Sequence, residues 1–151
     1  MTGPDSAASA VSRVIFGLIA ALSLAGVIVS AISLQRHYAK SATQFCDINQ
    51  NFNCDIVNRS EYSSIVGIPV AGIGVAGYAA LFVFSTWWKM RPETPNRLLG
   101  TAIAGLAFAL YLTYVEAYVL TAWCILCLIS QFLIFLISIL AIFIKVRSAR
   151  A

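Results

Sequence analysis

The chain has 151 residues, of which 60% are hydrophobic and only 11% are charged. Soluble domains carry about 25% charged residues, so this composition leaves too few charges to cover a water-facing surface and indicates an integral membrane protein. The net charge of +4 comes mostly from basic residues that flank apolar segments, and no basic stripe with interleaved aromatic residues indicates nucleic-acid binding.

Residues 1–12 are small and polar, and we expect them to form a disordered tail. Arg13 then precedes the uncharged run 14–34, which is long enough for one membrane span. A signal peptide is the alternative, but the run is long for a signal peptide and no small-residue cleavage site precedes a soluble domain. We therefore predict the first transmembrane helix over residues 14–34.

Residues 35–66 form the one long polar stretch, and they contain the first cysteine pair, Cys46 and Cys54. The Asn-rich segment 49–53 predicts a turn or an irregular loop. Residues 60–66 are expected to form a short amphipathic helix on the membrane surface. The side chains that would enter the interface are Tyr62, Ile65 and Val66.

The second apolar run covers residues 67–88 and opens with Gly-Ile-Pro. Proline is tolerated in a first helical turn because its missing N–H would have no partner within the helix there. Small residues give this segment a face that allows close helix–helix contact in lipid. Trp87 and Trp88 lie at its far end, where amphipathic rings favour the membrane interface.

A short basic loop leads to residues 98–144, in which only Glu116 is charged. As one helix, this stretch would be about 70 Å long, more than twice the thickness of a bilayer core. It must therefore turn back near residues 120–123, which gives helices over about 98–120 and 123–145. The predicted fold is an all-α bundle of four transmembrane helices over residues 13–147, with a long external loop between the first two.

The basic residues predict the orientation of this multi-pass protein in the cell membrane. With both termini in the cytoplasm, the inner segments carry seven basic residues and the outer segments carry three, as the positive-inside rule requires. The inner residues are Arg13, Lys89, Arg91, Arg97, Lys145, Arg147 and Arg150, and the outer ones are Arg36, Lys40 and Arg59. Both cysteine pairs then lie on the external face, where disulfides persist.

The second cysteine pair, Cys124 and Cys127, forms a CxxC at the start of the last helix. Backbone N–H groups and the helix dipole stabilise a thiolate at such a position. Two dithiols on one face can exchange electrons through a mixed disulfide, and the deeper Cys127 would meet a lipid-soluble acceptor. A quinone fits, because it takes the two electrons that a dithiol supplies. Two static structural disulfides are the alternative to this exchange. A zinc site is disfavoured, because the spacing between Cys46 and Cys54 exceeds that of a zinc knuckle.

This arrangement resembles the vitamin K epoxide reductase family over nearly the whole chain. The segment CDIVNRSEYSSIVGIP, residues 54–69, is similar to the prokaryotic branch, in which a serine follows the cysteine by six residues and Gly-Ile-Pro comes next. The resemblance implies that Cys46 and Cys54 form the shuttle pair and that Cys54 attacks Cys124. It further implies that Cys127 reduces the quinone.

The resemblance also suggests substrate and partner contacts. Ser60 matches the family's serine near the active cysteines, although as a residue it equally fits an N-cap of the surface helix. Tyr62 and Gln131 are expected in the quinone pocket. Because a short basic tail stands where many prokaryotic members have a fused thioredoxin-like domain, a separate thioredoxin-fold protein is the expected electron donor. Without the animal-type loop segment, menaquinone or ubiquinone is favoured over a vitamin K-like epoxide.

Glu116 is a charged residue in an apolar span, and such residues are candidates for a functional role. It also lies close enough to the external end to reach the interface or to pair with Arg36 or Arg59. A small four-helix transporter that uses Glu116 is therefore an alternative to the oxidoreductase. A DsbB-type enzyme is a second alternative, but it carries its CxxC in the first external loop. We predict a membrane thiol–quinone oxidoreductase that supports disulfide-bond formation.

Overall fold

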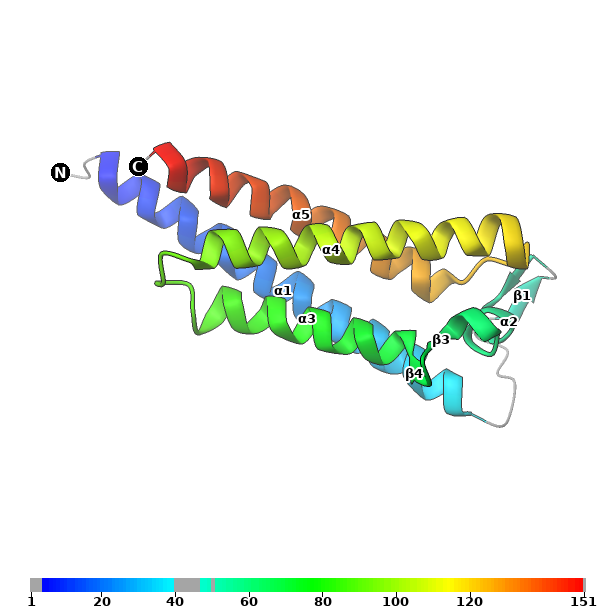
Figure 1. Ribbon diagram of the computed structural model, residues 1–151. Coiled ribbons are helices and arrows are strands. Elements are labelled where there is room, and N and C mark those ends of the chain that lie inside the picture. The colour runs from blue at the N-terminus through cyan, green and yellow to red at the C-terminus, as the bar shows by residue number, and fades with distance from the viewer. Residues whose placement is uncertain (1–3, 40–46, 50, 151) are drawn as a thin grey trace.

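The computed structural model describes residues 4–39, 47–49 and 51–150, and four long helices dominate this part of the chain (Figure 1). They are α1 (Pro4–Tyr38), α3 (Val70–Thr86), α4 (Thr94–Val115) and α5 (Ile125–Arg150). Three spans among the described residues are long and apolar enough to cross a membrane: 9–38, 94–120 and 125–150. The remaining predicted span, α3, is also apolar but has only 17 residues.

Short elements connect these helices. The loop after α1 contains β1 (Asp47–Asn49), β2 (Phe52–Asn53), α2 (Cys54–Asn58), the 3-10 helix η1 (Glu61–Ser63), β3 (Ser64–Ile65) and β4 (Ile68–Pro69). A π-helical segment, η2 (Glu116–Leu120), continues α4. Figure 1 shows α2 and the strands at one end of the bundle and both chain termini at the other. We call the first of these the cysteine end.

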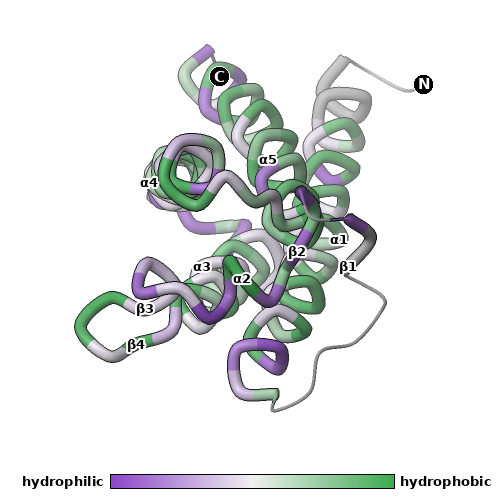
Figure 2. The backbone as a smooth tube through the Cα atoms, turned by 90° about the vertical axis from the view of Figure 1, so that its right-hand side faces the viewer, coloured by the Kyte–Doolittle hydropathy of each residue, from purple (hydrophilic) through white to green (hydrophobic). Residues whose placement is uncertain are grey.

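The four long helices pack side by side around an apolar core (Figure 2). α1 lies against α3 and α5, and α4 lies against α5 and α3. The most deeply buried core side chains include Ile19, Leu81, Leu98 and Ile137. Large apolar side chains also cover the outside of the helices, including Leu18, Ile28, Phe132 and Phe143. Apolar residues on both the inner and outer faces are expected of helices surrounded by lipid.

Small residues allow α1 and α3 to approach closely. A Cβ atom at Gly26 would lie 2.3 Å from the ring of Tyr78, so a larger residue there would force the two helices apart. Gly74 has a similar role, because its Cβ would lie 2.9 Å from the Ser30 hydroxyl. Close contact through glycine is a common basis of helix association in membranes, where burial from water supplies little driving force.

The structure corrects two expectations about local structure. The expected tail is helical from Pro4, because proline suits the first helical turn and the following Ala-rich residues favour a helix. The surface helix expected over residues 60–66 is wrong: η1 is followed by a β3–β4 hairpin. Val66 and Gly67 form its turn with φ of 53° and 81°. Positive φ at both central residues suits a tight hairpin but ends a helix.

Candidate functional site

The CxxC pair lies where the chain reverses between η2 and α5. Thr121 adopts a left-handed conformation with φ of 48° and ends η2, so the turn occupies residues 121–124. The carbonyl of Cys124 accepts the Leu128 N–H at 3.0 Å, which makes Cys124 the residue that opens α5. Cys127 follows within the first turn. Cys124 is buried, Cys127 is partly buried, and both are free thiols.

The loop after α1 is tied directly to this turn. The Trp123 N–H donates to the Asn51 carbonyl at 2.8 Å, and the Asn53 N–H donates to the Trp123 carbonyl at 3.2 Å. Phe52 and Trp123 therefore form a parallel bridge. The Asn53 side chain then caps α2 by accepting the N–H groups of residues 55 and 56. These bonds hold Cys54, the first residue of α2, beside the CxxC turn.

Three cysteines meet as a result. Cys54 and Cys124 are fully buried in one cluster with Leu126, and Cys127 packs against it. Cys54 takes part in a disulfide, whereas Cys46 lies outside the described residues. A hydrogen bond from the Cys127 thiol lowers the pKa of the Cys124 thiol, and this effect exceeds the opposing effect of burial. A thiol with a lowered pKa is a better leaving group in disulfide exchange.

Glu116 also belongs to this site. Its side chain is 1% exposed, and its Oε2 accepts the backbone N–H of Cys124 at 3.1 Å. The Cys127 thiol is close enough to the same carboxyl group for the two to interact electrostatically. The expected exposure at the interface is wrong because Glu116 is buried, and the expected pairing is wrong because neither Arg36 nor Arg59 forms an ion pair with it among the described residues. Arg59 instead donates to the Ala39 carbonyl at 2.5 Å and lies 3.9 Å from Asp55.

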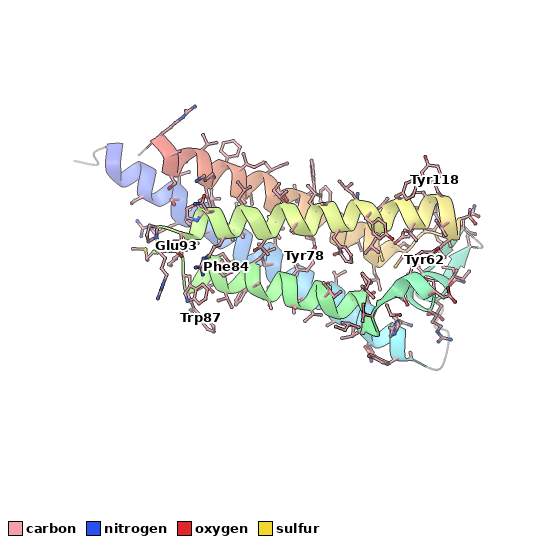
Figure 3. The ribbon with its side chains drawn as sticks, viewed as in Figure 1. Tyr62, Tyr78, Phe84, Trp87, Glu93 and Tyr118 are labelled. Carbon is pink, nitrogen blue, oxygen red and sulfur yellow. The ribbon has the colours of Figure 1, made fainter. Side chains whose placement is uncertain are left out.

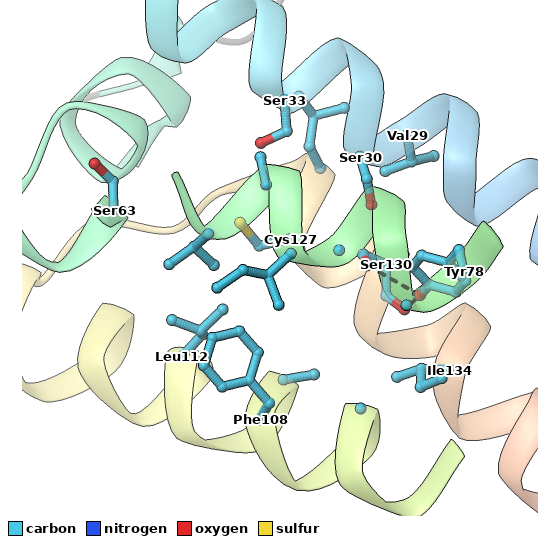
Figure 4. A pocket seen from close by; sticks show the side chains of 18 of the residues that line it. Val29, Ser30, Ser33, Ser63, Tyr78, Phe108, Leu112, Cys127, Ser130 and Ile134 are labelled. Atoms are coloured by element: carbon cyan, nitrogen blue, oxygen red, sulfur yellow. Dashed lines mark hydrogen bonds between the residues drawn. The ribbon is translucent and has the colours of Figure 1, made fainter. Parts of the chain in front are cut away.

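A cavity of about 560 Å³ opens beside Cys127, between the four long helices and α2 (Figure 4). Cys127 and Glu116 both line it. Its other polar lining residues near the cysteine end are Ser33, His37, Asn58, Ser60, Tyr62 and Ser63. Farther along the bundle, the lining consists mainly of small and apolar residues, including Gly77, Leu81, Gly100, Ala104, Gly105, Phe108 and Ile134. The cavity thus joins a polar head region to a long apolar region.

Hydrogen bonds organise the polar wall of the cavity. Ser33 donates its hydroxyl to Asn58 Oδ1 at 2.9 Å, and His37 Nδ1 donates to the Asn58 carbonyl at 2.6 Å. Asn58 Nδ2 is buried and has no hydrogen-bond partner among the described residues. Deeper in the cavity, the Tyr78 hydroxyl donates to the Ser130 carbonyl at 2.6 Å (Figure 4). The sequence alone indicates no functional role for Asn58, because one amide in a polar loop carries no distinctive pattern.

The expected quinone-pocket residues separate into two groups. Ser60 and Tyr62 line the cavity, and the Ser60 hydroxyl donates to the Val57 carbonyl at 2.8 Å without capping η1. Gln131 does not line it. Gln131 instead lies in another groove between α4 and α5, where its Oε1 accepts the hydroxyl of Thr113.

The remaining tyrosines differ in their placement. Figure 3 shows Tyr78 between the helices and Tyr118 pointing away from the bundle at the cysteine end. Tyr118 is 75% exposed, and its ring lies 5.0 Å from that of Tyr114, which is also exposed. The tyrosines at helical spacing in this part of α4 and η2 therefore face outward and do not line the cavity.

The sequence model of the vitamin K epoxide reductase family matches residues 17–142 of the chain. The matched range begins in α1 and ends in α5, so it includes both cysteine pairs and all the residues that line the cavity. It also includes Glu116. The match therefore covers the candidate site as a whole.

Proposed function

This chain belongs to the vitamin K epoxide reductase family, and from that premise we propose that it oxidises a thioredoxin-fold dithiol protein and reduces a quinone, supporting disulfide-bond formation. Membership of the family implies a membrane thiol–disulfide oxidoreductase that uses a quinone. The apolar helices agree with a location in a membrane. The proposal adds the order of electron transfer and the residues that perform it.

The proposed path has three exchanges that conserve atoms and electrons. The partner's dithiol first reduces the Cys46–Cys54 disulfide and becomes a disulfide itself. Cys54 then attacks Cys124 of an oxidised Cys124–Cys127 pair, and Cys127 leaves as a thiolate. Cys46 finally attacks Cys54 of this mixed disulfide and releases Cys124. The lowered pKa of the Cys124 thiol favours the last step, because a more acidic thiol leaves faster.

The single observation that carries this proposal is the burial of Cys54 and Cys124 in one cluster with Cys127 against it. Disulfide exchange requires direct contact between the attacking and the attacked sulfur atoms. Two static disulfides would have no need to lie close to each other. The arrangement of a disulfide at Cys54 and thiols at Cys124 and Cys127 corresponds to the state in which electrons have reached the inner pair. That pair is then ready to reduce the quinone.

We assign the quinone to the cavity beside Cys127. Ligand sites are typically concave and mostly apolar, with a few polar groups that orient the ligand. The ring would lie at the polar end near Ser60 and Tyr62, and the apolar end would hold the isoprenoid chain. Asn58 Nδ2 supplies a buried donor without a partner among the described residues, suited to a quinone carbonyl. Menaquinone or ubiquinone, or a vitamin K-like quinone, fits this description.

We also propose that the cysteine end faces the outside of the cell and that both termini are cytoplasmic. The basic residues at the end with the termini outnumber those at the cysteine end, as the positive-inside rule requires. Disulfide formation would then occur in a compartment that lacks the reducing systems of the cytosol.

The test uses the full-length protein in lipid vesicles with a reduced thioredoxin-fold protein and menaquinone, while quinone absorbance is followed. Wild type should form one quinol for each disulfide formed in the partner. Each of the four single Cys→Ala variants should lose this coupled activity. Coupled turnover that survives in any of the four variants would contradict the proposed path, and failure of the wild type to reduce any quinone would contradict the function.

A further inference from the structure

The thiol exchange path leaves one buried ionisable group without a role, the carboxyl group of Glu116. A carboxyl group in a membrane-spanning segment is costly and is retained mainly where it serves a function. Glu116 has no basic partner: no Lys or Arg of the described residues lines the cavity around it. Structural ion pairing therefore does not account for its presence.

The two oxygens of this carboxyl group have different surroundings. Oε2 accepts the Cys124 N–H at 3.1 Å, which fixes the side chain against the turn that opens α5. Oε1 is buried and has no hydrogen-bond partner among the described residues. Buried polar atoms are nearly always paired, so an unpaired carboxylate oxygen on a cavity wall indicates an interaction that forms during ligand binding or reaction.

Glu116 also lies beside the sulfur atom that we assign to quinone reduction. Glu116 and Cys127 line the same cavity, and the carboxyl group is close enough to the Cys127 thiol to interact with it electrostatically. The thiolate is the reactive form of cysteine, so the Cys127 thiol must lose its proton to react. A reduced quinone must gain two protons. One carboxyl group on the wall of the cavity that the thiol also lines can serve both needs.

We propose that Glu116 is a catalytic residue of quinone reduction, which accepts the proton of the Cys127 thiol and delivers it to the reduced quinone. This inference rests on the proposed function. In the complete step, two S–H bonds break, the Cys124–Cys127 disulfide forms, and two electrons pass to the quinone. One proton travels through Glu116 and the second comes from the Cys124 thiol, so the carboxylate is regenerated.

Glu116 also stands at an irregularity of the backbone. α4 is regular until Val115, and η2 begins at Glu116 itself. A π-helical turn changes the rotational phase of the following residues, and such turns occur frequently at functional sites. The titratable residues that interact with Glu116 are Cys124 and Cys127, and Tyr62 and Tyr78 line the same cavity. His37 also lines the cavity but is hydrogen-bonded to the Asn58 carbonyl, and Asp55 on α2 lies near Arg59.

The test compares Glu116→Gln, Glu116→Asp and wild type in two separate half-reactions. Gln keeps an oxygen that can accept the Cys124 N–H but cannot take a proton from a thiol, whereas Asp keeps the acid. Single-turnover reduction of menaquinone by the prereduced protein should slow by about 10²-fold in Glu116→Gln, the usual loss for one general acid–base group. Glu116→Asp should retain more activity. Oxidation of the reduced thioredoxin-fold partner by the loop disulfide should be unchanged in both.

Ser23→Ala is the matched control, because Ser23 is also a buried polar residue without a partner among the described residues but does not line the cavity. Its quinone reduction should equal that of wild type. Equal quinone reduction rates in wild type and Glu116→Gln would overturn the inference while leaving the proposed function intact. Failure of the wild type to reduce quinone would instead overturn the function.

A measurement on the wild type keeps the inference testable even if Glu116→Gln does not fold. The rate of single-turnover quinone reduction should fall at low pH through an ionisation that the partner-oxidation half-reaction lacks, because protonated Glu116 cannot accept the Cys127 proton. A quinone reduction rate that does not change with pH across the range in which carboxyl groups ionise would contradict the role of Glu116.

Discussion

The middle of the helix bundle and its cysteine end are both buried, but they are built differently. In the middle, Ile19, Leu98 and Ile137 are packed with almost no exposed surface inside regular helices. At the cysteine end, Asn58 Nδ2 and Glu116 Oε1 are buried without partners among the described residues, and unlike the unpaired Ser23 hydroxyl in the middle of α1, both belong to residues that line the cavity. The backbone there also departs from regular geometry, with a π-helix and a left-handed residue before the CxxC.

This difference separates stability from chemistry. Close packing of apolar side chains stabilises a bundle and tolerates little change in volume. Unpaired buried polar groups and irregular backbone cost stability, so a protein retains them mainly where they act in function. Substitutions in the middle should therefore change unfolding, whereas substitutions at the cysteine end should change quinone binding or turnover. Four predictions, together with the Glu116 test, examine this separation.

The largest effect is expected for Cys127→Ala. Quinone reduction should fall to background, because Cys127 is the sulfur atom that lines the cavity. The thermal unfolding midpoint should change little, since Cys127 is only partly buried and its replacement is small. Quinone absorbance and thermal unfolding in the same lipid preparation measure the two quantities. Unchanged turnover would refute the assignment of Cys127.

Cys46→Ala should block oxidation of the thioredoxin-fold partner but leave quinone reduction possible with a small dithiol. A small dithiol can reach the Cys124–Cys127 disulfide without the shuttle pair, whereas a folded partner cannot. Quinone reduction with each of the two reductants is the measurement. Equal loss of activity with both reductants would show that Cys46 does not act as a shuttle.

Ile137→Ala tests the middle of the bundle. We expect the free energy of unfolding to fall by about 2 kcal/mol, the low end for a buried Ile→Ala change because the unfolded helices still lie in lipid. Quinone reduction per folded molecule should match wild type, since Ile137 does not line the cavity. Unfolding in mixed detergent gives the stability. A tenfold fall in turnover of the folded protein would break the separation.

Asn58→Leu should raise the KM for quinone by about tenfold, which corresponds to the loss of one hydrogen bond of about 1.4 kcal/mol to the substrate. Turnover at saturating quinone should change less, because the cysteines and Glu116 remain. Ser33→Ala is the control: it removes the hydroxyl that donates to Asn58 Oδ1 but leaves the Asn58 N–H donors in place. An unchanged KM in Asn58→Leu would exclude this amide from the quinone site.

Three apolar helices of the described residues are long enough to cross a membrane, as the sequence indicates, because long uncharged runs have few other stable structures in a membrane. The break at residues 121–124 could also be predicted from the sequence, since residues 98–144 are too long for one span. The sequence does not predict which residues of α5 face the cavity. Residues on all sides of α5 are apolar, so no pattern indicates that Gln131 faces a groove on α4 while Cys127 faces the cavity.

The local geometry of the site was harder to predict for a different reason. The pairing of Phe52 with Trp123 joins segments about 70 residues apart through backbone bonds, which leave no trace in side-chain identity. The π-helix that begins at Glu116 has no recognised sequence signal. The β3–β4 hairpin could have been predicted in part, because Val66-Gly67 places a glycine at a turn position.

Trapping of the mixed disulfide tests the central claim most directly. The Cys46→Ala/Cys127→Ala double variant retains only Cys54 and Cys124, which share one buried cluster. Mild oxidation in lipid should join these two residues, as peptide mass analysis would detect, and faster than it joins Cys54 to Cys127 in the Cys46→Ala/Cys124→Ala variant. If Cys54 and Cys124 remain free thiols under these conditions, the two cysteine pairs do not exchange electrons as proposed.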